Sequence, residues 1–456
     1  NLAELNLAQT VQLVADTLHV TINQGKPLAQ ALYRHTGGNP LFLRQLLQSL
    51  YAQKLIYFTY RDWHWEWNLE AILKQPYSDD LLSFLVEKLH KLDPETLKVL
   101  KWSACHGDRF HPDLITSTGE GPIAQVEEYL RQAQKENLIL RQKDGSYRFL
   151  HDRIRQAAYE LIPADQKKEM HLRLGRLLAA STAQDHLEMR IIDIAKHLNL
   201  GVELITDPAE RLQLAEYNLM AGRKVKAAAA YRSALYYLRS GLELLPDHPW
   251  EKHHNLTRAL TIEMAQCEYM CGNHDIALQM IDTVLEQGGS PRQRVEQHLL
   301  KTIFFTGLNR HREAMATGLA GLKELGIAFP ARPGKLLLLQ RLFWTRWCLR
   351  RKNLTEITVL PEQADPLQIV AMDLLIALSA SAYYLDPMLC ASSILKMVEI
   401  ALKHPNVKHT PVAVGSYAVV ASLIFGTSKN IYRLGQAALS LAEKHDYPSV
   451  RGRYVY

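Results

Sequence analysis

Residues 37–40 are the first stretch of the sequence whose residue types could contact a nucleotide. Gly37, Gly38 and Pro40 interrupt a helical pattern, because two glycines and a proline cannot continue a helix. Asn39 can cap the next helix, and Pro40 suits its first position. A flat proline ring beside exposed backbone can also rest against a planar nucleobase. Spacing alone favours the simpler interpretation, an ordinary helix-breaking turn.

The second such stretch is Phe149-Leu150-His151-Asp152-Arg153, where a predicted strand leads into a predicted helix. A histidine at a helix start lies beside free backbone N–H groups, which are a common binding place for phosphate. The alternative is that His151 only caps the helix, since a lone histidine is more often structural than a ligand. The residues themselves leave both interpretations open.

Several kinds of chemistry are missing from the sequence. It has no phosphate-binding GxxxxGK[ST] loop and no HExxH, GxSxG or kinase signature. Cys267 and Cys271 are four residues apart without a second pair of ligands, so we interpret them as packing residues and predict no metal site. The five cysteines include no CxxC pair, which favours a reducing, cytoplasmic location. We therefore predict no catalytic residue in this chain.

The elements around these motifs predict a mainly α protein of three parts. The chain has 456 residues, which is too long for one hydrophobic core. Residues 1–75 contain helices and an aromatic β-hairpin, and residues 76–162 contain three helices followed by a hairpin with an Asp144-Gly145 turn. The second part is therefore predicted to be a winged helix-turn-helix. Residues 163–456 are predicted to be helical almost throughout.

The long helical part contains an internal repeat. Gly222 and Gly272 are each followed five residues later by an alanine, and Gly307 with Ala314 marks a looser third copy. Small residues let paired helices approach closely, so the pattern predicts a tetratricopeptide-like α-solenoid. The chain begins at Asn1 without a methionine and ends in the middle of this pattern. We therefore expect it to be a piece of a longer protein.

The order of these parts and motifs resembles the STAND class of signalling ATPases. More narrowly, it resembles the predicted-ATPase segment of large bacterial sensory proteins that also carry Ser/Thr kinase and histidine-kinase modules. The most specific match is residues 147–159, Tyr-Arg-Phe-Leu-His-Asp-Arg-Ile-Arg-Gln-Ala-Ala-Tyr. The likeness covers essentially the whole chain. It implies that residues 1–75 are the helical lid of an ATPase.

The resemblance also implies roles for single residues. Gly38, Asn39 and Pro40 would pack against adenine, with Gly37 supporting the loop. His151 would contact the β-phosphate of ADP and hold the closed state, although Leu150 stands where the class has methionine. Asp152 would then brace the local turn.

The phosphate-loop lysine, the Mg²⁺-binding acid and the sensor arginine of the class must all lie before Asn1. ATP or ADP with Mg²⁺ would therefore be bound through an upstream nucleotide-binding domain in cis, and not by this chain alone. The function implied is the regulatory and sensor portion of a nucleotide-dependent signalling switch, with a protein or small-molecule ligand on the repeats. The parent would be an ATPase and could also be a protein kinase. The alternatives are a non-catalytic tetratricopeptide-like scaffold and a part of a STAND-type transcription activator.

Nucleic acid is not an expected partner. The net charge of +6 is spread over a long chain, and the third helix of the predicted winged part has a net charge of −1. DNA-binding modules concentrate lysine and arginine at this position. Its charged residues are Glu127, Glu128, Arg131, Lys135 and Glu136.

Three further stretches have apolar or basic patterns. We interpret the alternating Trp63, Trp65 and Trp67 as packing residues and not as a base-stacking platform. Residues 335–352 contain six cations and no acid, which we interpret as a helix with a buried apolar stripe and a solvated basic face. The alternative is contact with an anionic membrane or an acidic partner. Residues 410–428 are uncharged, and we interpret them as a buried helix and expect no membrane span.

Overall fold

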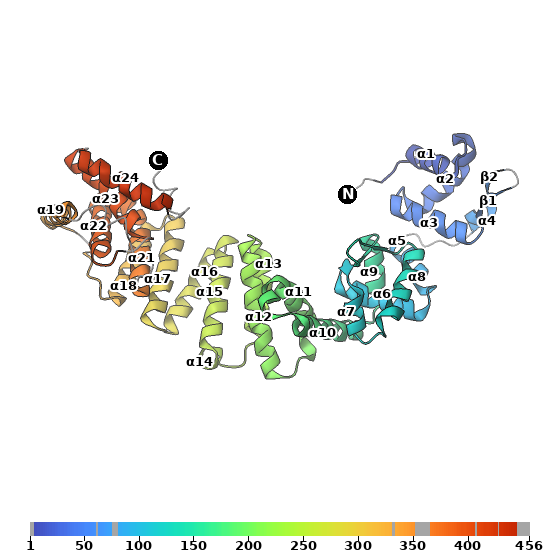
Figure 1. Ribbon diagram of the computed structural model, residues 1–456, viewed down its shortest axis with the longest axis horizontal. Coiled ribbons are helices and arrows are strands. Elements are labelled where there is room, and N and C mark those ends of the chain that lie inside the picture. Colours follow the sequence, from blue (N-terminus) through green and yellow to red (C-terminus); the bar gives the residue numbers. More distant parts are fainter. Residues whose placement is uncertain are drawn as a thin grey trace. The chain divides into compact units, whose positions relative to one another are not determined.

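The computed structural model describes residues 4–60, 63–74, 81–330, 333–351, 365–405, 408–426 and 428–444, apart from a few side chains. The chain forms two compact units, Asn1–Leu214 and Ala215–Tyr456. The prediction of a mainly α protein is confirmed, because the described part is largely helical and holds only two small sheets (Figure 1). The three predicted domains, with boundaries after residues 75 and 162, remain predictions.

The first unit begins with three helices and a β-hairpin. Helix α2 starts at Ile22, because Thr21 is its N-cap and forms a capping box with Gln24. Pro27 therefore lies inside the helix. The elements are α1 (Leu7–Leu18), α2 (Ile22–Thr36), α3 (Pro40–Ala52), β1 (Ile56–Thr59), β2 (His64–Trp67) and α4 (Leu69–Lys74).

The aromatic hairpin packs on the helices through two of its three tryptophans. Trp65 lies opposite Phe58 in the antiparallel register and meets its ring edge-on at 5.4 Å. Trp65 and Trp67 pack against the core of the unit, as expected. Trp63 does not, because its side chain is 78% exposed.

The next elements combine helices with a small sheet, and their assignment as a winged helix-turn-helix remains a prediction. The three strands form one antiparallel sheet of order β3-β5-β4. Sequence analysis missed β3, since a two-residue strand shows no alternation, and it missed α5. The elements are α5 (Leu81–His90), α6 (Pro94–His106), β3 (Arg109–Phe110), α7 (Pro112–Ser117), α8 (Ile123–Lys135), β4 (Ile139–Arg141), β5 (Tyr147–Phe149) and α9 (Asp152–Glu160).

Helix α5 joins the N-terminal helices to the winged part in a single hydrophobic core. Phe42 of α3 packs on Phe84 of α5, with ring centroids 5.2 Å apart. On another side, α5 packs against α9. The unit then continues into α10 (Ala164–Ser181) and α11 (Leu187–Leu200), with short 3₁₀ helices η1 (Gln184–His186) and η2 (Val202–Leu204). Helix α10 packs against α11 and α6.

The second unit is a row of packed helix pairs (Figure 1). Helix α12 crosses the boundary between the two units, and α15 with α16, α17 with α18, α21 with α22, and α23 with α24 form successive pairs. The elements are α12 (Pro208–Ala227), α13 (Tyr231–Glu243), α14 (Pro249–Lys252), α15 (His254–Met270), α16 (His274–Glu286), α17 (Pro291–Gly307), α18 (His311–Glu324), α19 (Lys335–Arg351), α21 (Pro366–Leu385), α22 (Pro387–Lys403), α23 (Thr410–Phe425) and α24 (Lys429–Lys444).

The predicted equivalence of Gly222 and Gly272 is wrong. Gly222 lies inside α12, where an added Cβ would come within 2.7 Å of Leu238. Gly272 lies in the turn between α15 and α16, in a left-handed conformation with nothing near a Cβ position. Glycine is therefore favoured by close packing at position 222 and by the backbone conformation at position 272.

The true equivalent positions are Ala229, Gly272 and Asn309. Each lies in the turn between two helices with a positive φ, of 58°, 90° and 59° respectively. Each is followed five residues later by an alanine with no exposed surface. These alanines are Ala234, Ala277 and Ala314. The repeat is therefore marked by the turn conformation and a buried alanine.

Ala229→Gly is expected to raise the free energy of unfolding of the second unit by about 0.5–1 kcal/mol, because glycine adopts a left-handed conformation without the strain of a Cβ. Gly272→Ala is the matched opposite change and is expected to lower it by about the same amount. Urea unfolding of both variants measures the two effects. An equal destabilisation by both would contradict the equivalence of these turns.

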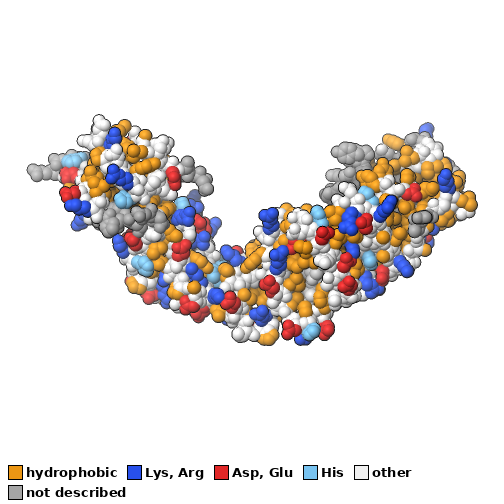
Figure 2. Space-filling view, turned by 180° about the vertical axis from the view of Figure 1, so that it is seen from behind, with side chains coloured by type: hydrophobic (Ala, Val, Ile, Leu, Met, Phe, Trp, Pro, Cys, Tyr) orange, Lys and Arg blue, Asp and Glu red, His pale blue; other side chains and the backbone are white. Residues whose placement is uncertain are grey.

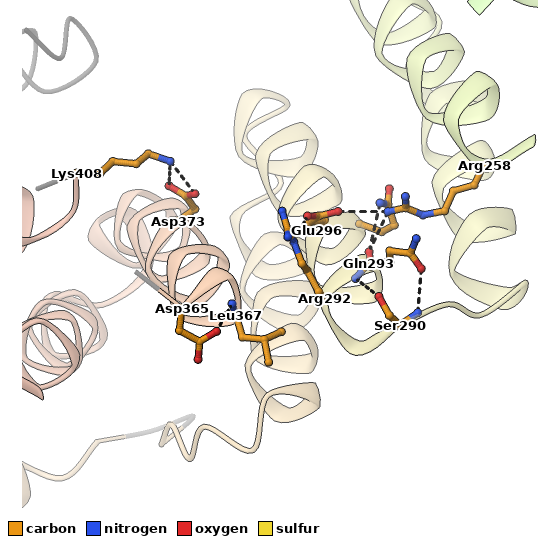
Figure 3. A network of polar contacts seen from close by, with 10 residues as sticks. Arg258, Ser290, Arg292, Gln293, Glu296, Asp365, Leu367, Asp373 and Lys408 are labelled. Carbon is orange, nitrogen blue, oxygen red and sulfur yellow. Dashed lines mark hydrogen bonds and ion pairs between the residues drawn. The ribbon is translucent and has the colours of Figure 1, made fainter. Parts of the chain in front are cut away.

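Polar contacts link successive helix pairs (Figure 3). Arg258 of α15 donates to Glu296 of α17 and to the backbone carbonyl of Gln293, both at 3.4 Å. Ser290 caps α17, and its hydroxyl accepts the backbone N–H of Gln293 at 3.3 Å. The Arg258 contacts therefore join α15 to α17, whereas the Ser290 contact lies within the first turn of α17.

One helix of the described residues, α21, is long and apolar enough to cross a membrane, with a mean hydropathy of 1.5. It packs against α17, α18 and α22, and 44% of its apolar window is buried inside the protein. Helix α23, which contains most of the uncharged stretch, has 16 residues. Its Ala413, Val414 and Tyr417 belong to the core of the second unit, as the interpretation of a buried helix requires.

Candidate functional site

The Gly-Gly-Asn-Pro loop connects α2 to α3 and touches the N-terminal segment of the chain. Gly37 caps α2 in a left-handed conformation with φ 56°. Gly38 also has a positive φ, of 81°, and its carbonyl accepts the N–H of Leu5 at 2.9 Å. A Cβ at Gly38 would lie 1.9 Å from the carbonyl oxygen of Leu5. Glycine at position 38 is therefore required by backbone packing, whatever the loop binds.

Asn39 and Pro40 start α3 as the sequence predicts. The Asn39 side-chain oxygen accepts the backbone N–H groups of Leu41 and Phe42, both at 3.1 Å. Pro40 is the first helical residue and is only half-buried. This geometry agrees with the helix-starting turn. The contact with adenine remains a prediction.

His151 caps α9 through Nδ1, which leaves Nε2 of its ring able to form another hydrogen bond. Its Nδ1 accepts the backbone N–H of Arg153 at 3.2 Å, and the side chain is exposed. An accepting Nδ1 leaves the proton of the neutral ring on Nε2. Among the described residues, Nε2 has no hydrogen-bond partner. Asp152 accepts a hydrogen bond from Arg155 at 2.9 Å, three residues further along the same helix, and its bracing role remains a prediction.

The two motifs lie on different helices of the same unit. Pro40 starts α3 and His151 caps α9, and both helices pack on α5. No polar contact between the loop and His151 is present in the described part of the unit. The structure therefore places both predicted sites in one unit without bringing their side chains together.

The opposite end of α3 borders a hollow of about 650 Å³, which the sequence did not reveal. Lys88 of α5 donates to the Gln45 side-chain oxygen at 2.8 Å and to the Glu136 carbonyl at 2.9 Å. Burial lowers the pKa of Lys88. The lining also includes Gln48, Trp65, Lys91 and Lys135. Pro40 and His151 do not line this hollow.

A buried polar cluster joins the winged part to α10 and α11, and it was also missed. The Tyr159 hydroxyl lies 2.9 Å from Nε2 of His171, and Nδ1 of His171 lies 2.8 Å from Nδ1 of His197. The Cys105 sulfur lies 3.3 Å from Nδ1 of His171. These residues come from α9, α10, α11 and α6. Only Tyr159 belongs to a motif, and no regular spacing connects the others.

Burial keeps this cluster uncharged at neutral pH. It lowers the pKa of His171 to about 4 and that of His197 to about 3, with positive neighbours adding to the shift. It raises the pKa of the Cys105 thiol to about 12, so this cysteine is no nucleophile. The cluster is therefore a structural link between α9 and the helices that follow it.

The other sequence candidates give no second site. Cys267 is buried in α15, and burial raises the pKa of its thiol to about 11, which agrees with a packing role. Across the residues that the structure describes, no group of three or more histidine, cysteine, aspartate or glutamate side chains could hold a metal ion.

Comparison with known proteins gives similarity to signalling proteins, while no protein-family profile matches the chain. Hybrid signal transduction histidine kinase G of Dictyostelium discoideum is 26% identical over 371 residues, covering 66% of this chain and 11% of that protein. Peroxide stress-activated histidine kinase mak3 of Schizosaccharomyces pombe is 24% identical over 325 residues, covering 69% of this chain and 14% of that protein. The chain thus spans only a small part of these relatives. Both organisms are eukaryotes, so these relatives do not support the bacterial setting of the resemblance.

Among solved structures, the chain is similar to a protein of the STAND class that its motifs resemble. That protein is the signal transduction ATPase with a tetratricopeptide repeat sensor from Pyrococcus horikoshii. The sequence identity is 16%, and the match covers 100% of this chain and 75% of that chain with a TM-score of 0.32.

Proposed function

We propose that the chain is the regulatory and sensor portion of a cytoplasmic, nucleotide-dependent signalling switch. Its similarity to segments of two histidine kinases supports the signalling role. A nucleotide-binding domain elsewhere in the parent protein supplies the phosphate loop and holds Mg²⁺. Pro40 contacts the adenine of ADP, and His151 contacts the β-phosphate.

The geometry of His151 is the observation that carries this proposal. Its Nδ1 is engaged in the cap of α9, which directs the Nε2–H away from the helix. The side chain is exposed at a helix N-terminus, where the backbone N–H groups and the helix dipole favour an anion. One side chain can therefore cap the helix and donate to a phosphate oxygen at the same time.

The buried cluster connects α9, the helix that His151 caps, to the helices that follow it by hydrogen bonds. Tyr159 is on the same helix as His151 and bonds to His171 of α10, which bonds to His197 of α11. A displacement of α9 would strain these hydrogen bonds. A protein or small-molecule ligand on the repeats would favour opening only if it binds the open state more tightly than the closed one.

His151→Asn separates the two roles of the histidine. Asparagine is a good N-cap, so the variant keeps the stability of α9, but its shorter side chain no longer places an N–H donor where Nε2 of the histidine ring lies. We expect ADP to leave the parent protein about tenfold faster or more, which corresponds to one hydrogen bond to a charged group. His151→Ala should lose both functions and about 1 kcal/mol of stability. Dissociation of a fluorescent ADP analogue and thermal unfolding measure these effects.

His111→Ala is the matched control, because His111 is an exposed N-cap in the same unit without a side-chain cap bond. It should change neither ADP release nor stability. If His151→Asn retained ADP like the unaltered protein, His151 would only cap α9, and the non-catalytic scaffold would become the better interpretation.

A further inference from the structure

Helix α19 is apolar on its outer face as well as on its inner face. Leu342, Thr345 and Leu349 are buried and hold the helix against the second unit. On the outside, Leu336 is 73% exposed and Phe343 58%. Trp344 and Leu339 are also exposed. The interpretation of a solvated basic face is therefore incomplete, because a surface helix in water normally exposes polar side chains.

The apolar surface continues onto the end of α23. The Phe343 ring meets the Phe425 ring edge-on, with centroids 5.8 Å apart. Beside Phe425, Leu423 and Ile424 are exposed. Figure 2 shows hydrophobic side chains gathered on the surface at the C-terminal end of the chain. We call this surface the aromatic patch, and it comprises Leu336, Leu339, Phe343 and Trp344 of α19 with Leu423 and Ile424 of α23.

Cations without acidic partners surround the aromatic patch. The Arg346 guanidinium lies 4.3 Å above the Phe425 ring. The Nη1 atom of Arg341 is buried and has no hydrogen-bond partner. Within the described residues, no carboxylate pairs with Lys335, Arg341 or Arg346. The sequence explains this, because residues 333–352 and 404–442 contain neither aspartate nor glutamate.

We propose that the aromatic patch binds the surface of an anionic phospholipid bilayer, with α19 lying in the plane of the interface. Phe343 and Trp344 would enter the boundary between headgroups and acyl chains, where aromatic side chains are favoured. Arg341 and Arg346 would bind lipid phosphates while their stems lie along apolar surface. This is a peripheral contact, because α19 has 17 residues and carries cations along its length.

A bilayer fits these features better than a protein partner does. A neutral apolar partner would cover Lys335, Arg341 and Arg346 without supplying an acidic group to any of them, which costs free energy. A short acidic peptide would pair with the cations but leave much of the aromatic surface in water. An anionic bilayer supplies phosphate groups for the cations and, below them, an apolar layer for the aromatic side chains.

Co-sedimentation of the 456-residue chain with lipid vesicles tests the proposal. We expect binding to vesicles of phosphatidylcholine with phosphatidylserine, weak binding to phosphatidylcholine alone, and a decrease with added salt. Trp344→Ser should lower partitioning about tenfold or more, since a large apolar side chain no longer leaves water. Arg341→Gln should lower mainly the part that depends on phosphatidylserine.

Trp63→Ser is the matched control, because Trp63 is an exposed tryptophan of the β-hairpin in the other unit. It should leave vesicle binding unchanged. Trp63 and Trp344 are exposed and Arg341 is half-buried, so circular dichroism of the three variants checks that each is folded. The proposal is overturned if phosphatidylserine does not increase binding or if Trp344→Ser binds like the unaltered chain. Binding of an acidic peptide without vesicle binding would also overturn it and indicate a protein partner.

Discussion

Gly38→Ala is expected to lower the free energy of unfolding of the first unit by about 3 kcal/mol. Part of the loss is the left-handed conformation at φ 81°, which costs about 1 kcal/mol for alanine. The rest comes from the new Cβ, which would lie 1.9 Å from the Leu5 carbonyl oxygen and force two backbone segments apart. Urea unfolding of the chain, followed by circular dichroism, measures the difference.

Gly37→Ala separates these two contributions. Gly37 is the neighbouring residue with φ 56°, and nothing lies within 4 Å of its Cβ position. This variant should therefore lose only about 1 kcal/mol, the cost of the conformation. Equal losses in the two variants would show that the N-terminal segment does not press against Gly38.

The local part of this site could be predicted from the sequence. Asn39 and Pro40 act within one helical turn, and capping depends only on neighbouring residues. The same holds for the hairpin at Asp144-Gly145 and for the cap at His151. The close approach of Leu5 to Gly38 joins segments more than thirty residues apart, and no short pattern signals it.

The repeat shows a different limit of sequence reasoning. Glycine was used as the marker, yet the left-handed turn position is held by Ala229 and Asn309 in two of three copies. A turn conformation is fixed by the helices on both sides and can override the preference of one residue. The buried alanine five residues later is the better marker, because it depends on the close approach of two helices.

The buried histidines could not be predicted, because their positions follow no periodic pattern. His171 and His197 are on separate helices, and Cys105 comes from a third. These residues are far apart in the sequence, and only the packing of α6, α9, α10 and α11 brings them together. The outer face of α19 was missed for a similar reason, since its composition does not say which apolar residues turn inward.

Acidification from pH 7 to pH 4 is expected to destabilise the first unit by about 3–6 kcal/mol through this histidine cluster, since each of the two shifted histidines contributes up to about 3 kcal/mol. Burial lowers the pKa of His171 to about 4 and of His197 to about 3, from an ordinary value of 6.5. Between these values the unfolded chain binds protons that the folded unit does not. The stabilisation is therefore complete above pH 6.5 and is lost as the pH falls toward 4.

Replacing His197 with glutamine should reduce this pH dependence. Glutamine can still donate to Nδ1 of His171, but it takes up no proton. Urea unfolding at several pH values between 7 and 4 should give a flatter dependence for His197→Gln. His111→Gln should retain the full slope, because His111 is exposed.

The pH dependence that remains in His197→Gln comes from His171 and from His106. His106 stacks on His197 with ring centroids 6.3 Å apart, and burial lowers its pKa as well. Lys196 adds positive charge near His171 and His197. A slope unchanged by His197→Gln would mean that His197 is already protonated in the folded unit. The 2.8 Å contact with His171 would then be a charged hydrogen bond, and the cluster would hold α10 and α11 together by charge and not by neutral packing.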